Sequence, residues 1–426
     1  MKTMFAALRI RNYRLFAVGS LVSNTGTWMQ RVAQDWLILA LTGSAGALGL
    51  TTGLQFLPVL LFSPIAGVIA DRFSKRSVMM VTQIAMSTTA AVLGVLAITG
   101  VARAWHVYAI AFAFGTAAAF DTPARQAFVN EMVGRDKLTN AVALNSASFN
   151  LGRMIGPAVA GGVIALLGSG VAASGWVILL NSGTYLAVLV ALKRMRSEEL
   201  NPVPPLPRAK GQLREGIAYV RSRPDIMLVM AILACAGMFA FNFQMTTALM
   251  ATQVYGKGAG EYGALGSILA IGSLAGALIA ARRNSSSQRL VVAAATLFGL
   301  VTLAAGLMPT YLTFALVLPV AGITSMTLMT AANSFVQMAA DPAMRGRVLA
   351  LYMTVFMGGT PFGAPLLGWV ADHAGPRWTL IGGGGITAVG TVLIAAYTAR
   401  RRGVVLTRDV WPGRHRHPDY ATVVAD

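Results

Sequence analysis

The sequence predicts an all-α integral membrane protein whose twelve transmembrane helices form two pseudo-symmetric six-helix halves. Three observations lead to this fold class. Twelve stretches are largely apolar over about 20 residues, the length that crosses a bilayer. The basic residues gather in alternate connections between these stretches. A pattern of glycines in the fifth stretch returns in the eleventh.

The composition is typical of a membrane protein, because 56% of the 426 residues are hydrophobic and 12% are charged. Soluble domains carry about 25% charged residues. A single cysteine, Cys235, excludes an internal disulfide, and the few histidines argue against a metal centre. The sequence also lacks a nucleotide-binding loop of the Walker type. We therefore expect no metal, no cofactor and no enzymatic activity.

The twelve predicted spans follow one another with short connections, except for one longer linker after the sixth. Their expected ranges are 14–41, 46–70, 77–100, 105–126, 140–167, 175–192, 226–250, 262–281, 290–308, 311–337, 348–371 and 378–398.

The basic residues predict the orientation of these spans. With the N-terminus inside, the inner connections hold 29 Lys and Arg residues, the outer ones hold three, and two lie within spans. The positive-inside rule then places both termini in the cytoplasm, with Lys2, Lys210 and Asp426 inside and Lys257 outside. The net charge of +19 is accordingly a topology signal and not a nucleic-acid-binding surface. We expect the plasma (inner) membrane as the location.

An internal repeat divides the chain into halves. Gly152, Gly156 and Gly161 return 207 positions later, without a gap, as Gly359, Gly363 and Gly368. The repeat predicts an N-terminal half over 1–192 and a C-terminal half over 225–398. A cytoplasmic linker over 193–224 joins them, and a cytoplasmic tail over 399–426 follows. A short amphipathic helix on the inner surface is expected at the end of the linker, although a solvated connector explains the same residues.

Span five carries an unusual run of small and polar residues. Its members are Gly152, Arg153, Gly156, Pro157 and Gly161. Small residues three or four positions apart let another helix backbone come close in a membrane. The proline removes one backbone donor and bends the helix. Arg153 is expected to face the seam between the halves and to need a carboxylate or carbonyl partner.

The connection between spans two and three combines an acid with bases. Its residues are Gly67, Asp71, Arg72, Lys75 and Arg76. The carboxylate can pair with arginines or face the positive N-terminus of another helix, so the loop is predicted to latch the two halves on the cytoplasmic side. An ordinary positive-inside loop would explain the bases but not the acid four residues after the glycine.

These features together resemble the major facilitator superfamily. The loop is similar to the signature that follows the second helix of that superfamily, and Gly152-x-x-x-Gly156-Pro157 is similar to the motif of its antiporters. The stretches Asn12-Tyr-Arg-Leu-Phe and Pro123-Ala-Arg125 resemble the enterobactin-exporter-like and multidrug-efflux branch. The resemblance implies proton-driven export.

Ionisable residues inside spans are costly in lipid and are functional candidates. Arg31 and Asp35 are four residues apart in span one, so the sequence predicts a pair on one helix face, and Asn24 and Trp28 extend the same stripe. Asp35 is the first candidate for proton coupling, with Arg31 as its partner and Asp121 in span four as the second. A static ion pair is the alternative in both spans.

Amide side chains give further candidates for a substrate cavity. They are Asn145, Asn242, Gln244 and Asn333. Amides in membranes also serve as contacts between helices, and that alternative stays open.

The resulting hypothesis is a secondary transporter, active as a monomer in the lipid bilayer. It would export a bulky, partly apolar small molecule, such as a drug, siderophore or secondary metabolite, in exchange for protons by alternating access. The alternatives are a proton-coupled importer of a small solute and, from another class, a membrane enzyme or channel.

Overall fold

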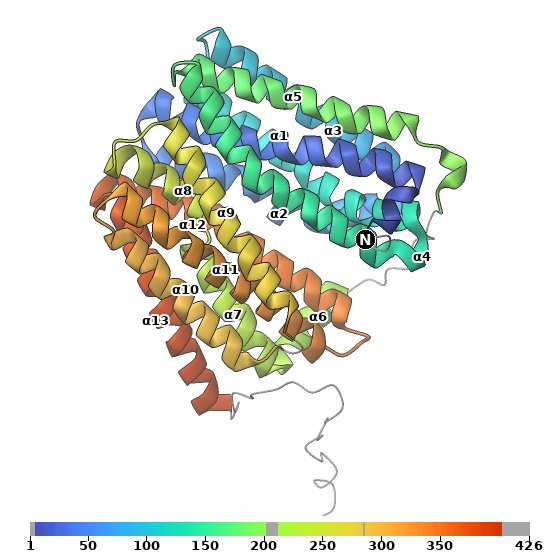
Figure 1. Ribbon diagram of the computed structural model, residues 1–426. Coiled ribbons are helices and arrows are strands. Elements are labelled where there is room, and N and C mark those ends of the chain that lie inside the picture. Colours follow the sequence, from blue (N-terminus) through green and yellow to red (C-terminus); the bar gives the residue numbers. More distant parts are fainter. Residues whose placement is uncertain (1–4, 202–211, 284–285, 403–426) are drawn as a thin grey trace, which may run out of the picture.

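A computed structural model describes residues 5–201, 212–283 and 286–402 of the chain (Figure 1). Beyond short helical turns at Ala6–Arg9 (η1) and Ser197–Glu199, these residues form long helices. The N-terminal half contains α1 (Arg11–Thr42), α2 (Ala45–Arg72), α3 (Lys75–Ile98), α4 (Ala104–Leu166) and α5 (Val171–Arg194). The C-terminal half contains α7 (Pro224–Phe239), α8 (Phe243–Leu249), a π-helical turn (Met250–Val254), α9 (Ala259–Ala281), α10 (Gln288–Leu307), α11 (Tyr311–Ala339), α12 (Arg345–Ala374) and α13 (Pro376–Arg402).

The predicted helical membrane fold is confirmed. In the described part of the chain, ten helices are long and apolar enough to cross a membrane. The first span, α1, and the first part of α4 are also long helices, and they carry the buried carboxylates Asp35 and Asp121. Together they give the twelve predicted spans.

Three spans differ from the expected ranges. Spans four and five are one helix, α4, whose helical geometry is interrupted at Gly134, with φ 68° and ψ 173°. The region predicted as a connection is therefore helical, and only the glycine can take this left-handed φ without strain. Span seven is broken between Phe239 and Phe243, which separates α7 from α8.

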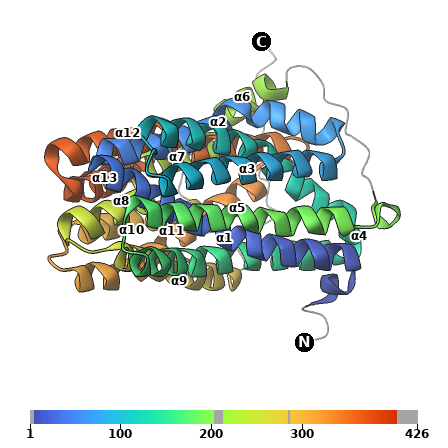
Figure 2. The same cartoon turned by 90° about the horizontal axis from the view of Figure 1, so that it is seen from above.

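The helices of each half pack mainly on one another. In the N-terminal half α1 packs on α4 and α5, and α2 packs on α4; in the C-terminal half α9 packs on α11, and α10 packs on α13. Figure 2 shows the long helices of both halves running in a common direction. The most extensive contacts between the halves are those of α2 with α12 and of α4 with α9.

The halves meet closely at one end of the bundle, which we call the closed end. It carries the turn at Gly43 between α1 and α2 and the turn at Gly375 between α12 and α13. From this end the halves diverge towards the opposite end, where η1 lies (Figure 1). Among the described residues, glycine contacts between α2 and α12 reach from the closed end only as far as Leu60 and Gly358.

Small residues make this approach possible. A side chain at Gly161 or Gly263 on the α4–α9 seam would collide with the backbone of the facing helix, and the same is true of Gly49 on the α2–α12 seam. Burial of such close backbone contacts is the usual way that membrane helices associate.

The linker region contains one further helix, α6 (Gln212–Ser222), where an amphipathic helix was expected. Glu215 of α6 pairs with Arg347 of α12 at 2.8 Å, and the Tyr219 hydroxyl accepts a bond from the backbone of Asp341 at 3.0 Å. The helix therefore packs on the C-terminal half. The proline-rich part of the linker, the tail beyond residue 402, and Lys2, Lys210 and Asp426 lie outside the described residues.

Candidate functional site

Asp35 joins the two halves near the closed end. Its side chain comes from the last third of α1 and is 3% exposed. One carboxylate oxygen accepts a hydrogen bond of 2.7 Å from the Gln244 amide on α8 and another of 2.7 Å from the Tyr262 hydroxyl on α9. Both donors belong to the C-terminal half. Asp35 is thus a buried acid whose bonds depend on how the halves are arranged.

The break in span seven positions one of these donors. Phe243 opens α8 after the interruption, with Asn242 at its N-cap and Gln244 one residue further. The Asn242 amide donates to the carbonyl of Met238 at 2.9 Å, which ties the broken segment to the end of α7. The geometry of the break therefore aims Gln244 at α1.

The expected pair of Arg31 and Asp35 is not formed within 4.0 Å in the described residues. Side chains on a helix lean towards its N-terminus, so the long Arg31 extends away from Asp35. Its guanidinium carbon lies 4.6 Å from the centre of the Trp28 ring and 5.5 Å from that of Phe56. Arg31 therefore contacts aromatic rings and Asp35 contacts the other half.

Arg153 lies at the seam between α4 and α9. It donates a hydrogen bond of 3.1 Å to the Ser273 hydroxyl across the seam, and its guanidinium carbon is 5.9 Å from the centre of the Trp28 ring. Gly156, one turn further along α4, leaves room for Trp28 of α1. Pro157 packs against Gly263 of α9. The span-five motif thus contacts α1 on one side and the C-terminal half on the other.

Asp121 forms a network inside the N-terminal half. It accepts bonds from Arg125 at 2.8 Å, Thr82 at 2.8 Å and Gln83 at 2.9 Å, and Arg125 also donates to Ser20 at 3.1 Å. The members of this network come from α1, α3 and α4, so the network does not depend on the other half. This geometry favours the static alternative for Asp121.

The remaining cavity candidates have contacts within their own halves. The Asn24 amide donates to Ser148 of α4 at 3.3 Å, within the N-terminal half. Asn333 accepts a bond from Gln337, one turn away on α11. Asn145 is half-buried on α4. Of the predicted residues, the structure therefore brings Arg31 and Arg153 to the ring of Trp28. It also brings Gln244 to Asp35.

Two bases of the predicted latch loop contact the N-terminal half and the start of the linker. Lys75 pairs with Glu131 of α4 at 3.1 Å, and Arg76 donates to the Ser197 hydroxyl at 2.7 Å. In this arrangement the halves have diverged at this end, so a bridge between them is expected only in the alternative arrangement. The latch stays a prediction for that arrangement.

Replacing Asp71 by Asn is expected to slow transport while leaving expression intact, because the amide loses charge-assisted bonds that would close this end. The loss amounts to about 0–1 kcal/mol for a surface pair and up to ~2 kcal/mol at a helix N-terminus. Transport rates normalised to protein in the membrane measure it. If Asp71→Asn and Arg76→Ala both transport like the wild type, the loop only sets the orientation of the spans and does not act as a latch.

A carboxylate at the closed end was not identified from the sequence. Asp372, near the end of α12, accepts bonds of 2.8 Å each from the Ser44 hydroxyl and from the backbone N–H groups of Ala45 and Gly46. These groups form the N-terminus of α2, so Asp372 caps a helix of the other half. The sequence does contain a pattern that could have identified this carboxylate. Gly368-Trp-Val-Ala-Asp372 has the same spacing as Gly67-Val-Ile-Ala-Asp71.

Replacing Asp372 by Ala is expected to open the closed end. Loss of a helix cap costs about 0.5–2 kcal/mol, which shifts the equilibrium between arrangements about 2- to 30-fold. Spin labels at the exposed Val101 and Leu307, in a Cys235→Ser background, would report a larger population of long distances. Glu261→Ala is the control, because Glu261 bonds the N-terminus of its own helix, α9. Equal distance distributions in both variants would contradict the role of Asp372 in holding the closed end together.

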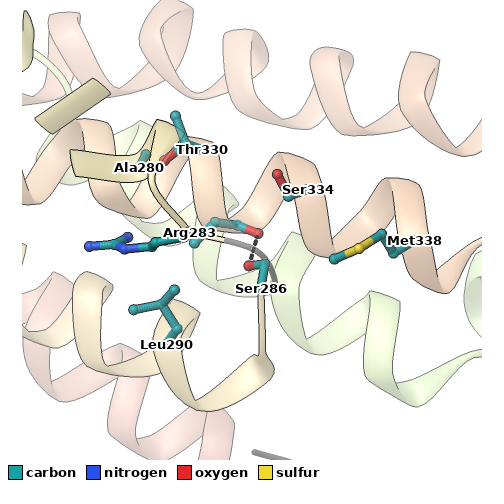
Figure 3. A pocket seen from close by; sticks show the side chains of 8 residues that line it. Ala280, Arg283, Ser286, Leu290, Thr330, Ser334 and Met338 are labelled. Atoms are coloured by element: carbon teal, nitrogen blue, oxygen red, sulfur yellow. Dashed lines mark hydrogen bonds between the residues drawn. The ribbon is translucent and has the colours of Figure 1, made fainter. Parts of the chain in front are cut away.

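One pocket lies away from these groups, at the opposite end of the C-terminal half (Figure 3). Its lining includes Arg283, Ser286 and Thr330, and Ser286 donates to the carbonyl of Ala331 at 2.7 Å. No cluster of metal-ligating side chains occurs within the described ranges.

The chain belongs to the transmembrane secretion effector family, which it matches over residues 2–415, and thus to the major facilitator superfamily. It is 28% identical to the multidrug efflux pump Tap of Mycolicibacterium fortuitum, over 86% of this chain and 91% of that protein. It is 26% identical to the enterobactin exporter EntS of Shigella flexneri, over 87% and 84%. A bacterial homologue of the lysosomal transporter Spinster, solved in an inward-facing, occupied conformation, shares the fold at a TM-score of 0.70 with 16% identity, over 95% and 99%.

These findings confirm the predicted family and fold. The chain is a multi-pass membrane transporter of the major facilitator type and not an enzyme.

Proposed function

We propose that the chain exports a bulky, partly apolar small molecule from the cytoplasm in exchange for protons. The observation that carries this proposal is the buried Asp35, whose two bond donors, Gln244 and Tyr262, belong to the other half. Relatives named as a multidrug efflux pump and an enterobactin exporter support the direction of transport.

Alternating access would change the surroundings of Asp35. When the closed end separates, Asp35 moves away from Gln244 and Tyr262 and meets water from that side. A carboxylate inside a membrane protein is costly without partners, so it either keeps its donors or takes a proton. Return to the present arrangement then favours proton release, because the Gln244 and Tyr262 donors stabilise the ionised carboxylate more than the neutral acid. One proton would therefore cross for each cycle of opening and closing.

The proposal places the closed end outside the cell. The excess of basic residues in the connections at the opposite end supports this orientation in the plasma (inner) membrane, with both termini in the cytoplasm.

An impermeant thiol reagent tests the orientation with single cysteines in a Cys235→Ser background. A cysteine at Lys257 is expected to react in intact cells, whereas a cysteine at Lys210 is expected to react only after the cells are opened. Reaction at position 210 from outside would reverse the topology and turn the proposed exporter into an importer.

Direction is tested with everted membrane vesicles and fluorescent amphipathic dyes of positive, neutral and negative charge. An exporter accumulates a dye in the vesicle lumen when the lumen is made acidic. Dye loss from preloaded vesicles under the same gradient would favour the alternative, a proton-coupled importer.

A further inference from the structure

Two arginines from different helices lie beside the same aromatic ring. The guanidinium carbons of Arg31 on α1 and Arg153 on α4 lie 4.6 Å and 5.9 Å from the centre of the Trp28 ring. The two positive charges interact unfavourably with each other. The Nε atom of Arg31 is buried and has no hydrogen-bond partner. The protein thus concentrates positive charge around Trp28.

No carboxylate of the described residues balances this charge within 4.0 Å. Arg153 bonds to a neutral hydroxyl, that of Ser273. Asp35 is the nearest acid along α1, and its carboxylate is held by Gln244 and Tyr262 of the other half. Two cations without an ion-pair partner within 4.0 Å are unfavourable between helices in a membrane, and such residues mark substrate pathways.

Aromatic side chains adjoin the cations. Phe56 of α2 lies beside Arg31, with its ring centre 5.5 Å from the guanidinium carbon. Phe149 of α4 packs edge-on against Trp28 with a centroid distance of 5.7 Å, and 48% of its surface remains exposed. A ligand with a ring and a charged group would find both kinds of contact here.

We propose that Arg31 and Arg153 bind an anionic group of the transported molecule, a carboxylate or a group of similar charge and size, while an aromatic part lies against Trp28 and Phe149. Guanidinium groups bind planar carboxylates with paired hydrogen bonds, and Arg31 has a buried N–H to satisfy. That the ligand is cargo rests on the proposed export function, whereas the binding of an anion does not.

The site also suggests how the ligand leaves. Asp35 follows Arg31 by one helical turn, and opening the closed end would release it from Gln244 and Tyr262. Before it takes up a proton, the released carboxylate competes with the bound anion for Arg31. Opening towards the outside would thereby weaken anion binding.

The test compares two probes of one shape, anthracene-carboxylate and anthracene-carboxamide, by equilibrium dialysis against the purified full chain in lipid nanodiscs. The carboxylate is expected to bind at least about tenfold more tightly, since a charge-assisted bond contributes more than 1.4 kcal/mol. Arg31→Gln and Arg153→Gln are each expected to remove most of this preference, because carboxylate binding weakens far more than carboxamide binding. Arg31→Lys keeps the charge and is expected to retain part of the preference.

Arg283→Gln is the matched control, because Arg283 is a cation that lines the separate pocket of Figure 3. The control is expected to bind both probes like the wild type. Equal affinities for the two probes, binding of neither at millimolar concentration, a preference unaffected by Arg31→Gln and Arg153→Gln, or a preference lost in Arg283→Gln would each overturn the assignment. Dye export in vesicles is measured separately, so a failure of the export function leaves the binding result standing, and the reverse also holds.

Discussion

Replacing Asp35 by Asn is expected to abolish uphill export, with a fall of at least about tenfold in the initial rate, while substrate binding and downhill exchange persist. The amide oxygen can still accept bonds from Tyr262 and Gln244, so the closed end keeps its contacts. The amide cannot take up and release a proton, however, and coupling therefore stops. Export of a dye by everted vesicles, with and without an imposed pH gradient, measures both properties.

Two further variants distinguish the loss of a titratable group at Asp35 from a change in the shape of its side chain. Asp35→Glu retains a carboxylate and is expected to keep some coupling. Asp121→Asn disturbs the network with Arg125 inside the N-terminal half, and is expected to lower stability while export keeps its proton dependence. Undiminished proton-dependent export by Asp35→Asn, together with loss of coupling in Asp121→Asn, would transfer the coupling role to Asp121.

Adding one methyl group at Gly161 is expected to block transport by preventing the closed end from forming. The Cβ of Gly161→Ala would overlap the carbonyl oxygen of Ala259 and come within 3.0 Å of the Gly263 Cα. Overpacking costs about 1–3 kcal/mol, which shifts the equilibrium roughly 5- to 150-fold towards the arrangement with this end open. Spin labels at Val101 and Leu307 measure the shift.

The neighbouring residue provides the control. A Cβ at Gly162 would have no other atom within 4 Å, so Gly162→Ala is expected to transport and to give distances like the wild type. The two variants add the same atom to adjacent positions of α4. If both behave alike, the close contact between α4 and α9 is not needed for closure.

Hydropathy was sufficient to predict the fold, because the cost of exposing backbone polar groups to lipid leaves a helical chain of this composition few alternatives. It predicted twelve spans, including α1, whose polar stripe marked Asp35 as a candidate. Hydropathy could not show that the helix persists around Gly134, since the residues there are polar enough for a connection.

The partners of the candidate residues could not be predicted from local spacing. An interval of four residues suggested that Arg31 pairs with Asp35, but the lean of helical side chains separates the two groups. Tyr262 lies 227 positions from Asp35, and only the docking of α9 against the N-terminal half brings them together. Asp372 shares the spacing of the loop around Asp71, yet its role as a cap depends on the position of α2.

Simultaneous measurement of dye and proton movement in proteoliposomes tests the central claim most directly. The liposomes enclose a pH indicator, and an outwardly directed dye gradient is imposed without any pH gradient. Dye and protons are expected to move in opposite directions through the wild type, and Asp35→Asn is expected to move the dye without protons. Protons moving with the dye, no proton movement in the wild type, or equal proton movement in Asp35→Asn would contradict it.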